Sequence, residues 1–465
     1  MSGPLSLEPG GVEADTLALR LAAPRPRRAP DDAMPGKRLP GRGPEEEAVC
    51  TLAAELADSI APAVHPYEVA ALLEAEGLSA SVIKERYGHP NLFSLATALY
   101  ERVPRTFPEP PPATDLWRPD TLRCLLRGVL FALPALAYLL TAPLWPLDRH
   151  APVLIVAGIA SWAWGQALGH RAHLRLAAGR REASGTLLSG SLLGAAVATS
   201  LAVLPADSAV AVGAAAAQSL YLAGASVLLV LARERLLLAA LSPLIAGAAA
   251  LPWWEPGPEL RAGLPLLALL ATLLAAGWVL RAGCGGRPEH TARPRLLASL
   301  PYGLFGLAAA VLVMLEGRRQ PYMVIALTLS MGPAEWLLYR YRGWSVAALR
   351  ASVTPVGFLL RSAAVLGLCL SAYLLLLLPA ALLTRSDPAT PLLLAVVLWT
   401  ALLLQAFGVA WPPAVLCLAA AGAAAAVTLP DLPPGPAVLP AACAAAAVCL
   451  TACAIHRLGR PHPHA

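Results

Sequence analysis

Water alone cannot solvate this chain of 465 residues, because 57% of them are hydrophobic, only 14% are charged, and the mean hydropathy is +0.62. Those values exclude an ordinary soluble protein, which needs more polar surface around its core. The net charge of +6 does not indicate a nucleic-acid partner, because most basic residues stand at the ends of apolar segments, where they orient membrane proteins. We therefore expect membrane lipids, and no nucleic acid, as partners.

Residues 1–44 are rich in Pro, Gly and Arg, as the runs APRPRRAP and MPGKRLPGRGP show. Such a composition buries too little apolar area to offset the entropy lost on ordering, so it predicts a disordered tail. The segment has no basic region followed by an apolar run, which argues against a signal peptide. We expect the chain to begin in the cytoplasm.

Residues 45–105 show the spacing of short amphipathic helices and predict a small acidic helical domain in the cytoplasm. The segment holds ten acidic and four basic side chains. A net charge of that sign repels phosphate, so the helix-turn-helix outline of VAALLEAEGLSASVIKERYG favours a protein partner over DNA. The proline-rich stretch at 106–120 predicts a stiff linker to the membrane part.

The segment EVAALLEAEGLSASVIKERYGHPNLFSLATALYERVP is similar to the cytoplasmic segment that precedes the spans in some multispanning membrane proteins of high-GC, actinobacterial-type bacteria. Arginine outnumbers lysine among the basic residues, 33 to two, which agrees with a high-GC genome. The resemblance implies the same architecture in a bacterial plasma membrane. It implies no catalytic residue, because that family has no assigned chemistry.

Residues 121–456 are almost continuously apolar and predict an all-α bundle of about twelve transmembrane helices, followed by a cytoplasmic tail at 457–465. A span needs roughly 20 apolar residues to cross about 30 Å of hydrocarbon. The expected spans lie near 123–145, 151–168, 184–204, 209–232, 236–252, 263–280, 297–315, 321–339, 362–384, 390–409, 412–429 and 437–455. Arginines gather in the even-numbered connections, so the positive-inside rule predicts that both termini are cytoplasmic.

No catalytic, metal-binding or nucleotide-binding motif stands out in the chain. The spans pair no serine with histidine and hold no two aspartates, and the first outer loop is only PLDRH. The eight cysteines form no CxxC pair and are typical of small apolar filler in helices. We therefore predict that the protein is not an enzyme and uses no cofactor or metal.

Four polar side chains enter the expected spans and are the candidates to line a cavity: Gln166, Gln218, Glu335 and Gln405. Amides within spans also bridge neighbouring helices without any functional role. Glu335 follows Gly332 and Pro333 and precedes the two candidate partners at the helix end, Arg340 and Arg342. A salt bridge with Arg340 that anchors the helix end and a place in a cytoplasmic cavity remain equal alternatives.

Spans two and eight occupy the same place in two halves of six, and both carry a glycine, a polar residue and a tryptophan, in SWAWGQALGHR and SMGPAEWLLYR. Interrupted helices at matching positions mark the pathway in transporters with repeated halves. Flippases that move lipid-linked saccharides across bacterial membranes resemble this chain in their many spans, short outer loops and lack of an ATP motif. The resemblance implies transport of an amphipathic or lipid-linked precursor for the cell envelope, in polysaccharide biosynthesis.

A second hypothesis belongs to another class. The protein would then be a non-catalytic membrane scaffold or assembly partner, and its domain at 45–105 would recruit a cytoplasmic protein. A cavity between the halves that is lined by the four candidate residues would favour transport, whereas a tightly packed apolar bundle would favour the scaffold.

Overall fold

The computed structural model describes residues 43–104, 118–145, 147–285, 295–352, 354–383, 387–428 and 438–460, and these residues are helical or lie in turns. Contacts divide the chain into two compact units, 13–115 and a larger one that holds 116–465. The tail predicted at 1–44 and the linker predicted at 106–120 lie almost wholly outside the described residues, so both remain predictions.

The described part of the smaller unit contains five helices, α2 (Pro44–Glu55), α3 (Ala57–Ile60), α4 (Pro66–Ala75), α5 (Ala80–Tyr87) and α6 (Leu92–Arg102). Local sequence sets their ends. Ser79 accepts a hydrogen bond from the Val82 amide at the start of α5, and Asn91 does the same for Ser94 at the start of α6. Gly88 ends α5 at φ 65°, a conformation that glycine adopts at little cost. A core of its own forms around Ile60, Leu73, Ile83, Leu95 and Leu99.

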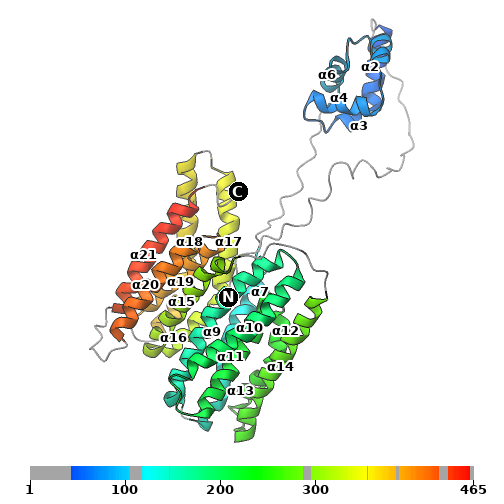
Figure 1. Ribbon diagram of the computed structural model, residues 1–465. Helices are drawn as coiled ribbons and strands as arrows, with labels where there is room; N and C mark the ends of the chain where they lie inside the picture. The colour runs from blue at the N-terminus through cyan, green and yellow to red at the C-terminus, as the bar shows by residue number, and fades with distance from the viewer. Residues whose placement is uncertain are drawn as a thin grey trace. The chain divides into compact units, whose positions relative to one another are not determined.

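The larger unit is an all-helical membrane bundle (Figure 1). Its first half comprises α7 (Thr121–Ala132), α8 (Ala135–Thr141), η1 (Ala142–Leu144), α9 (Leu147–Leu176), α10 (Arg180–Ala202), α11 (Ala209–Val230), α12 (Glu234–Ala240), α13 (Ser242–Ala250) and α14 (Pro258–Cys284). Its second half comprises η2 (Leu296–Ser299), α15 (Leu300–Arg319), α16 (Pro321–Leu329), α17 (Met331–Arg350), α18 (Pro355–Leu383), α19 (Ala389–Ala406), α20 (Trp411–Thr428) and α21 (Val438–Leu458).

Within the described residues, nine helical segments are long and apolar enough to cross a membrane. The other three expected spans correspond to helices that are interrupted or shorter, namely the α12–α13 pair, the α16–α17 pair and α20. The number twelve therefore remains a prediction.

Interrupted helices at matching positions of the two halves, expected in spans two and eight, are not found. The second span is the unbroken helix α9, whereas the eighth breaks at Ser330, between α16 and α17. The hydroxyl of Ser330 lies 2.8 Å from the Leu327 carbonyl oxygen and 2.9 Å from the Tyr373 hydroxyl. These contacts hold the break, whereas nothing equivalent in SWAWGQALGHR stops α9.

The two halves have separate hydrophobic cores. Among the described residues of the bundle, one cluster of buried apolar side chains draws its members only from 130–280, a small one only from 153–215, and the largest only from 305–458. Inside a membrane bundle, close van der Waals packing and hydrogen bonds between helices hold the helices together, because lipid tails are as apolar as the buried side chains. None of these clusters spans the two halves, although by its contacts the whole bundle is one compact unit.

The two halves meet where α9 packs against α15, and glycines of α15 lie in this contact. An added Cβ at Gly306 would lie 2.7 Å from Cγ of Gln166, and one at Gly303 would lie 3.1 Å from Cβ of Ala167. The backbones approach closely because these glycines carry no side chain. Helix α7 of the first half also contacts α16 and α17 of the second half. We call these contacts between the halves, α9 with α15 and α7 with α16 and α17, the seam.

The orientation of the bundle is tested by single cysteines placed in a variant without the eight native ones. Ser79→Cys, in the smaller unit, should be protected from an impermeant maleimide added to intact cells, whereas Ser208→Cys, between α10 and α11, should react. Labelling of position 79 without lysis, with position 208 protected, would contradict the cytoplasmic placement of the N-terminus.

Candidate functional site

Two arginines enter the bundle on the first helix of the larger unit. Asp120 caps α7 by accepting a hydrogen bond from the Arg123 amide, and Arg123 and Arg127 follow four residues apart, on one face of the helix. Arg127 lies about 10 Å along α7 from that cap, at a rise of about 1.5 Å per residue. Its side chain is only 14% exposed, so its charge needs partners within the protein.

Two carboxylates from different halves supply those partners. Oε1 of Glu335, on α17, lies 2.6 Å from Nη1 of Arg127. Oε1 of Glu234, the first residue of α12, lies 2.7 Å from Nη2 and 2.8 Å from Nε of the same guanidinium. Arg123 adds a second cation, with its Nε 2.8 Å from Glu234 Oε1. We call these four side chains the charge cluster; its formal charges sum to zero.

The cluster is built across the seam. Arg123, Arg127 and Glu234 belong to the first half, and Glu335 belongs to the second. The Arg127–Glu335 pair is therefore an ion pair between two bodies that have separate cores. Both of its side chains are nearly buried, at 14% and 13% exposure, so solvent screens the pair less than it screens a surface salt bridge.

Glycines bring α7 and α17 close enough for this pair to form. An added Cβ at Gly128 would lie 2.6 Å from the Leu329 carbonyl oxygen, and one at Gly332 would lie 2.6 Å from the Cys124 carbonyl oxygen. No larger residue fits at either position without moving the backbone. Beside them, the Trp336 indole donates a hydrogen bond to Thr121 Oγ1 at 3.2 Å.

Of the two alternatives for Glu335, the salt bridge with Arg340 does not form in this structure, because Glu335 pairs with Arg127. Five residues along a helix turn a side chain by about 140°, so Arg340 faces away from Glu335. Arg340 instead lies over the Trp336 ring at 5.0 Å, and Arg342 lies over the Phe407 ring at 5.2 Å. Both arginines thus pack against aromatic faces at the end of the span.

The three glutamines occupy separate helix contacts. Gln166 is buried on α9 against Gly306, and Gln218 on α11 donates to the Leu154 carbonyl at 3.2 Å. Gln405 is 3% exposed on α19, and its Nε2 finds no partner among the described residues. The structure therefore does not bring Gln166, Gln218 and Gln405 together with Glu335 in one cavity.

A small polar cavity lies elsewhere, between α9, α10 and α11 of the first half. Its volume is about 20 Å³, and four serines line it together with Trp164: Ser161, Ser191, Ser219 and Ser226. The hydroxyls of Ser161 and Ser219 are 3.4 Å apart. The space suits one water molecule, which would satisfy the buried hydroxyls of Ser191 and Ser226 that have no protein partner in the described structure.

A second polar contact crosses the seam near the end of α9. The His170 ring stacks on Tyr302 of α15, with centroids 3.7 Å apart, and its Nδ1 lies 3.1 Å from Ser299 Oγ. One turn further on, Nδ1 of His173 is buried without a partner in the described residues. The sequence indicated only that histidines lie at the ends of spans, because nothing local to α9 identifies a partner 129 residues away.

Removal of the central cation should destabilise the bundle more than removal of its neighbour. Arg127→Gln leaves two nearly buried carboxylates close together, whereas Arg123→Gln removes a side chain that is 43% exposed. Breaking a buried pair from one side costs about 3–5 kcal/mol, and an exposed pair contributes about 1 kcal/mol or less. Thermal midpoints of the purified proteins in one detergent should therefore fall much further for Arg127→Gln.

Equal midpoints for the two variants would contradict the central role of Arg127. The double variant Arg127→Gln with Glu335→Gln separates the causes, because it removes one buried carboxylate along with the cation. Its midpoint should recover part of the loss, since a charge is then no longer buried without a partner.

Comparisons with known proteins assign no family. No protein-family model matches the chain, and the curated proteins contain no significant match. Among solved structures, "Crystal structure of MATE P26A mutant" matches at 12% identity and a TM-score of 0.41, over 74% of this chain and 97% of that one. "Crystal structure of MATE in the bent conformation" matches at 15% identity and a TM-score of 0.38, over 73% of this chain and 91% of that one. Likenesses this weak do not place the chain in that family.

Proposed function

We propose that this membrane protein is a secondary transporter or flippase-like protein whose two halves move against each other. The observation that carries the proposal is that no cluster of buried apolar side chains among the described residues spans the two halves: two clusters, within 130–280 and within 153–215, belong to the first half, and one, within 305–458, belongs to the second. A static bundle gains most from one continuous core, whereas a transporter of the rocking type needs two bodies that keep their packing while they move.

The types of contact in the seam support such movement. Glycine contacts allow the backbones to approach closely, and the Arg127–Glu335 pair and the stacked His170 and Tyr302 rings add contacts that can break without moving either apolar core. Separating packed apolar side chains leaves a cavity, whereas breaking an ion pair does not. Arg127 would also keep Glu234 as a partner when its contact with Glu335 breaks, so its charge would not be left without compensation. We infer that the charge cluster is a latch that closes the seam at the end predicted to face the cytoplasm.

For the cargo we propose an amphipathic or lipid-linked precursor of the bacterial envelope, the class that the resemblance to flippases implies. In the present state, α9 packs closely on α15, and the candidate residues share no cavity, so this state would be a closed one. Transport then requires a second state with the seam open at one end. The proposal includes no catalytic step.

The scaffold hypothesis has one observation in its favour. In the smaller unit, Tyr67 and Phe93 are 67% and 56% exposed, and their rings meet edge to face with centroids 5.6 Å apart. Val64 is 63% exposed. Exposed aromatic side chains are enriched at protein interfaces, so recruitment of a cytoplasmic protein by this unit is the second candidate function.

Glu335→Gln distinguishes the two functions. A glutamine oxygen still accepts a hydrogen bond from Arg127, and Glu234 keeps the guanidinium paired, so folding and membrane abundance should stay near those of the wild type. If the pair is a latch, loss of the charge should abolish or strongly reduce complementation of a deletion strain. A scaffold should tolerate the change.

Glu182→Gln is the matched control. Glu182 on α10 pairs with Arg175 on α9, so this ion pair lies within the first half and does not cross the seam. We expect full complementation from this variant at normal abundance. Wild-type complementation by Glu335→Gln at normal abundance would contradict the latch and leave the scaffold as the better account.

A further inference from the structure

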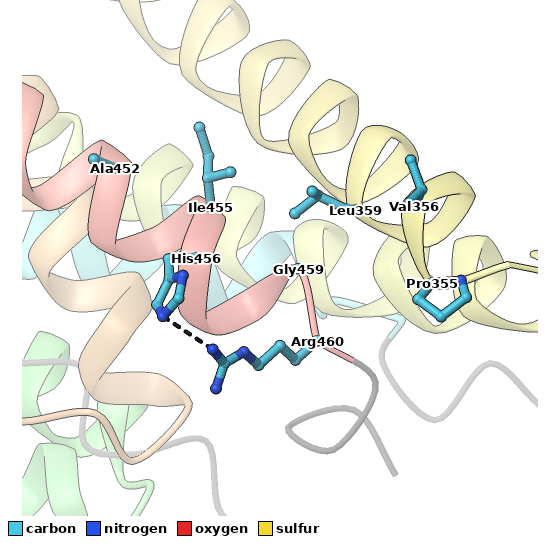
Figure 2. Close-up of a pocket in the computed structure, with 8 residues that line it drawn as sticks. All are labelled: Pro355, Val356, Leu359, Ala452, Ile455, His456, Gly459 and Arg460. Carbon is cyan, nitrogen blue, oxygen red and sulfur yellow. Dashed lines mark hydrogen bonds between the residues drawn. The ribbon is translucent and has the colours of Figure 1, made fainter.

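An open groove lies where the beginning of α18 meets the end of α21 (Figure 2). Its volume is about 540 Å³, within the range of small-molecule sites. Figure 2 shows Val356 and Leu359 on α18 opposite Ile455 on α21. The two helices meet where Leu359 lies against Gly459, since an added Cβ there would lie 2.2 Å from a Leu359 methyl group.

The walls of the groove are apolar and exposed. Val356 is 65% exposed and Ile455 is 36% exposed, and Ala452 continues the same surface along α21. Apolar side chains at the edge of a membrane bundle face acyl chains, so this surface is suited to a hydrocarbon tail.

The mouth of the groove is basic. His456 lies in the last turn of α21 and Arg460 follows two residues after the helix ends, where its Nη2 donates a hydrogen bond to Nε2 of His456 at 3.1 Å (Figure 2). None of the eight lining residues is acidic. The α18 N-terminus adds the positive end of a helix dipole at the same place, with Pro355 as its first residue. This charge selects an anion, and the apolar walls select one that carries a hydrocarbon chain.

We propose that this groove binds an anionic phospholipid, with its phosphate at Arg460 and His456 and an acyl chain along Val356, Leu359 and Ile455. Basic pockets between helices at the cytoplasmic side are a known way to hold such head groups. The site lies on the second half alone, away from the charge cluster, and does not depend on the transport proposal.

The test uses the full-length protein, purified in a neutral detergent and stripped of lipid. Binding of dioleoyl phosphatidylglycerol and of dioleoyl phosphatidylcholine is measured by native mass spectrometry, so that the chains are the same and only the head-group charge differs. We expect preferential retention of phosphatidylglycerol. Equal retention of the two lipids, or displacement of phosphatidylglycerol by millimolar inorganic phosphate, would contradict the proposal.

Arg460→Gln should weaken retention of phosphatidylglycerol about fivefold, as expected for one basic side chain at a membrane surface worth about 1 kcal/mol. Arg457→Gln is the matched control, because this arginine is exposed on the last turn of α21, three residues before Arg460, but does not line the groove. Equal losses from the two variants would indicate general surface attraction and would overturn the site.

Ala452→Phe tests the apolar part. The new side chain would fill the groove from its α21 wall, so retention should fall although no charge is lost. Unchanged retention in this variant would mean that no acyl chain lies there. Helical content and elution volume, equal to those of the wild type, show that each variant is folded.

Discussion

A guanidinium buried at the edge of a membrane must be neutralised by the protein, and in this chain that requirement joins elements far apart in sequence. Arg127 on α7 is 14% exposed, and its two carboxylate partners come from α12 and from α17, 107 and 208 residues away. Without either carboxylate, the cation would lose much of its compensation in a region of low dielectric constant. The positions of α7, α12 and α17 relative to one another therefore depend on this one side chain.

The rest of the bundle is arranged around that link. Gly128 and Gly332 let α7 and α17 approach until the Arg127 and Glu335 side chains meet, and Gly303 and Gly306 do the same for α9 and α15. Away from these contacts each half packs its own apolar core. The outcome is two halves that share no buried apolar cluster and are joined by small residues, an ion pair and the stacked rings of His170 and Tyr302. Such a seam suits relative movement of the halves, which is why transport is the function we favour.

The membrane class and most helices could be predicted from the sequence, because long apolar runs and terminal arginines are local signals. The break at Ser330 could not, since Ser330 contacts Tyr373 on a distant helix, and the glycine, glutamine and tryptophan of SWAWGQALGHR did not reveal that α9 runs unbroken. Glu335 stood out as an ionisable residue in a span, yet its partner was missed. Arg127 resembles any arginine near a span end, and only the tertiary fold places it beside Glu335. The three glutamines show the opposite error, because a polar residue in a span need not line a common cavity.

Movement of the halves is measured most directly by the distance between spin labels at the end of the bundle opposite the charge cluster. Labels at Val210 on α11 and Leu382 on α18, both exposed, report across the seam, and labels at Val210 and Leu266 on α14 report within the first half. In lipid bilayers, double electron–electron resonance should find two populations of distances between the labels of the first pair, and Arg127→Gln should change their ratio. The labels of the second pair should show one distance. A single narrow distance across the seam, unchanged by Arg127→Gln, would contradict the account.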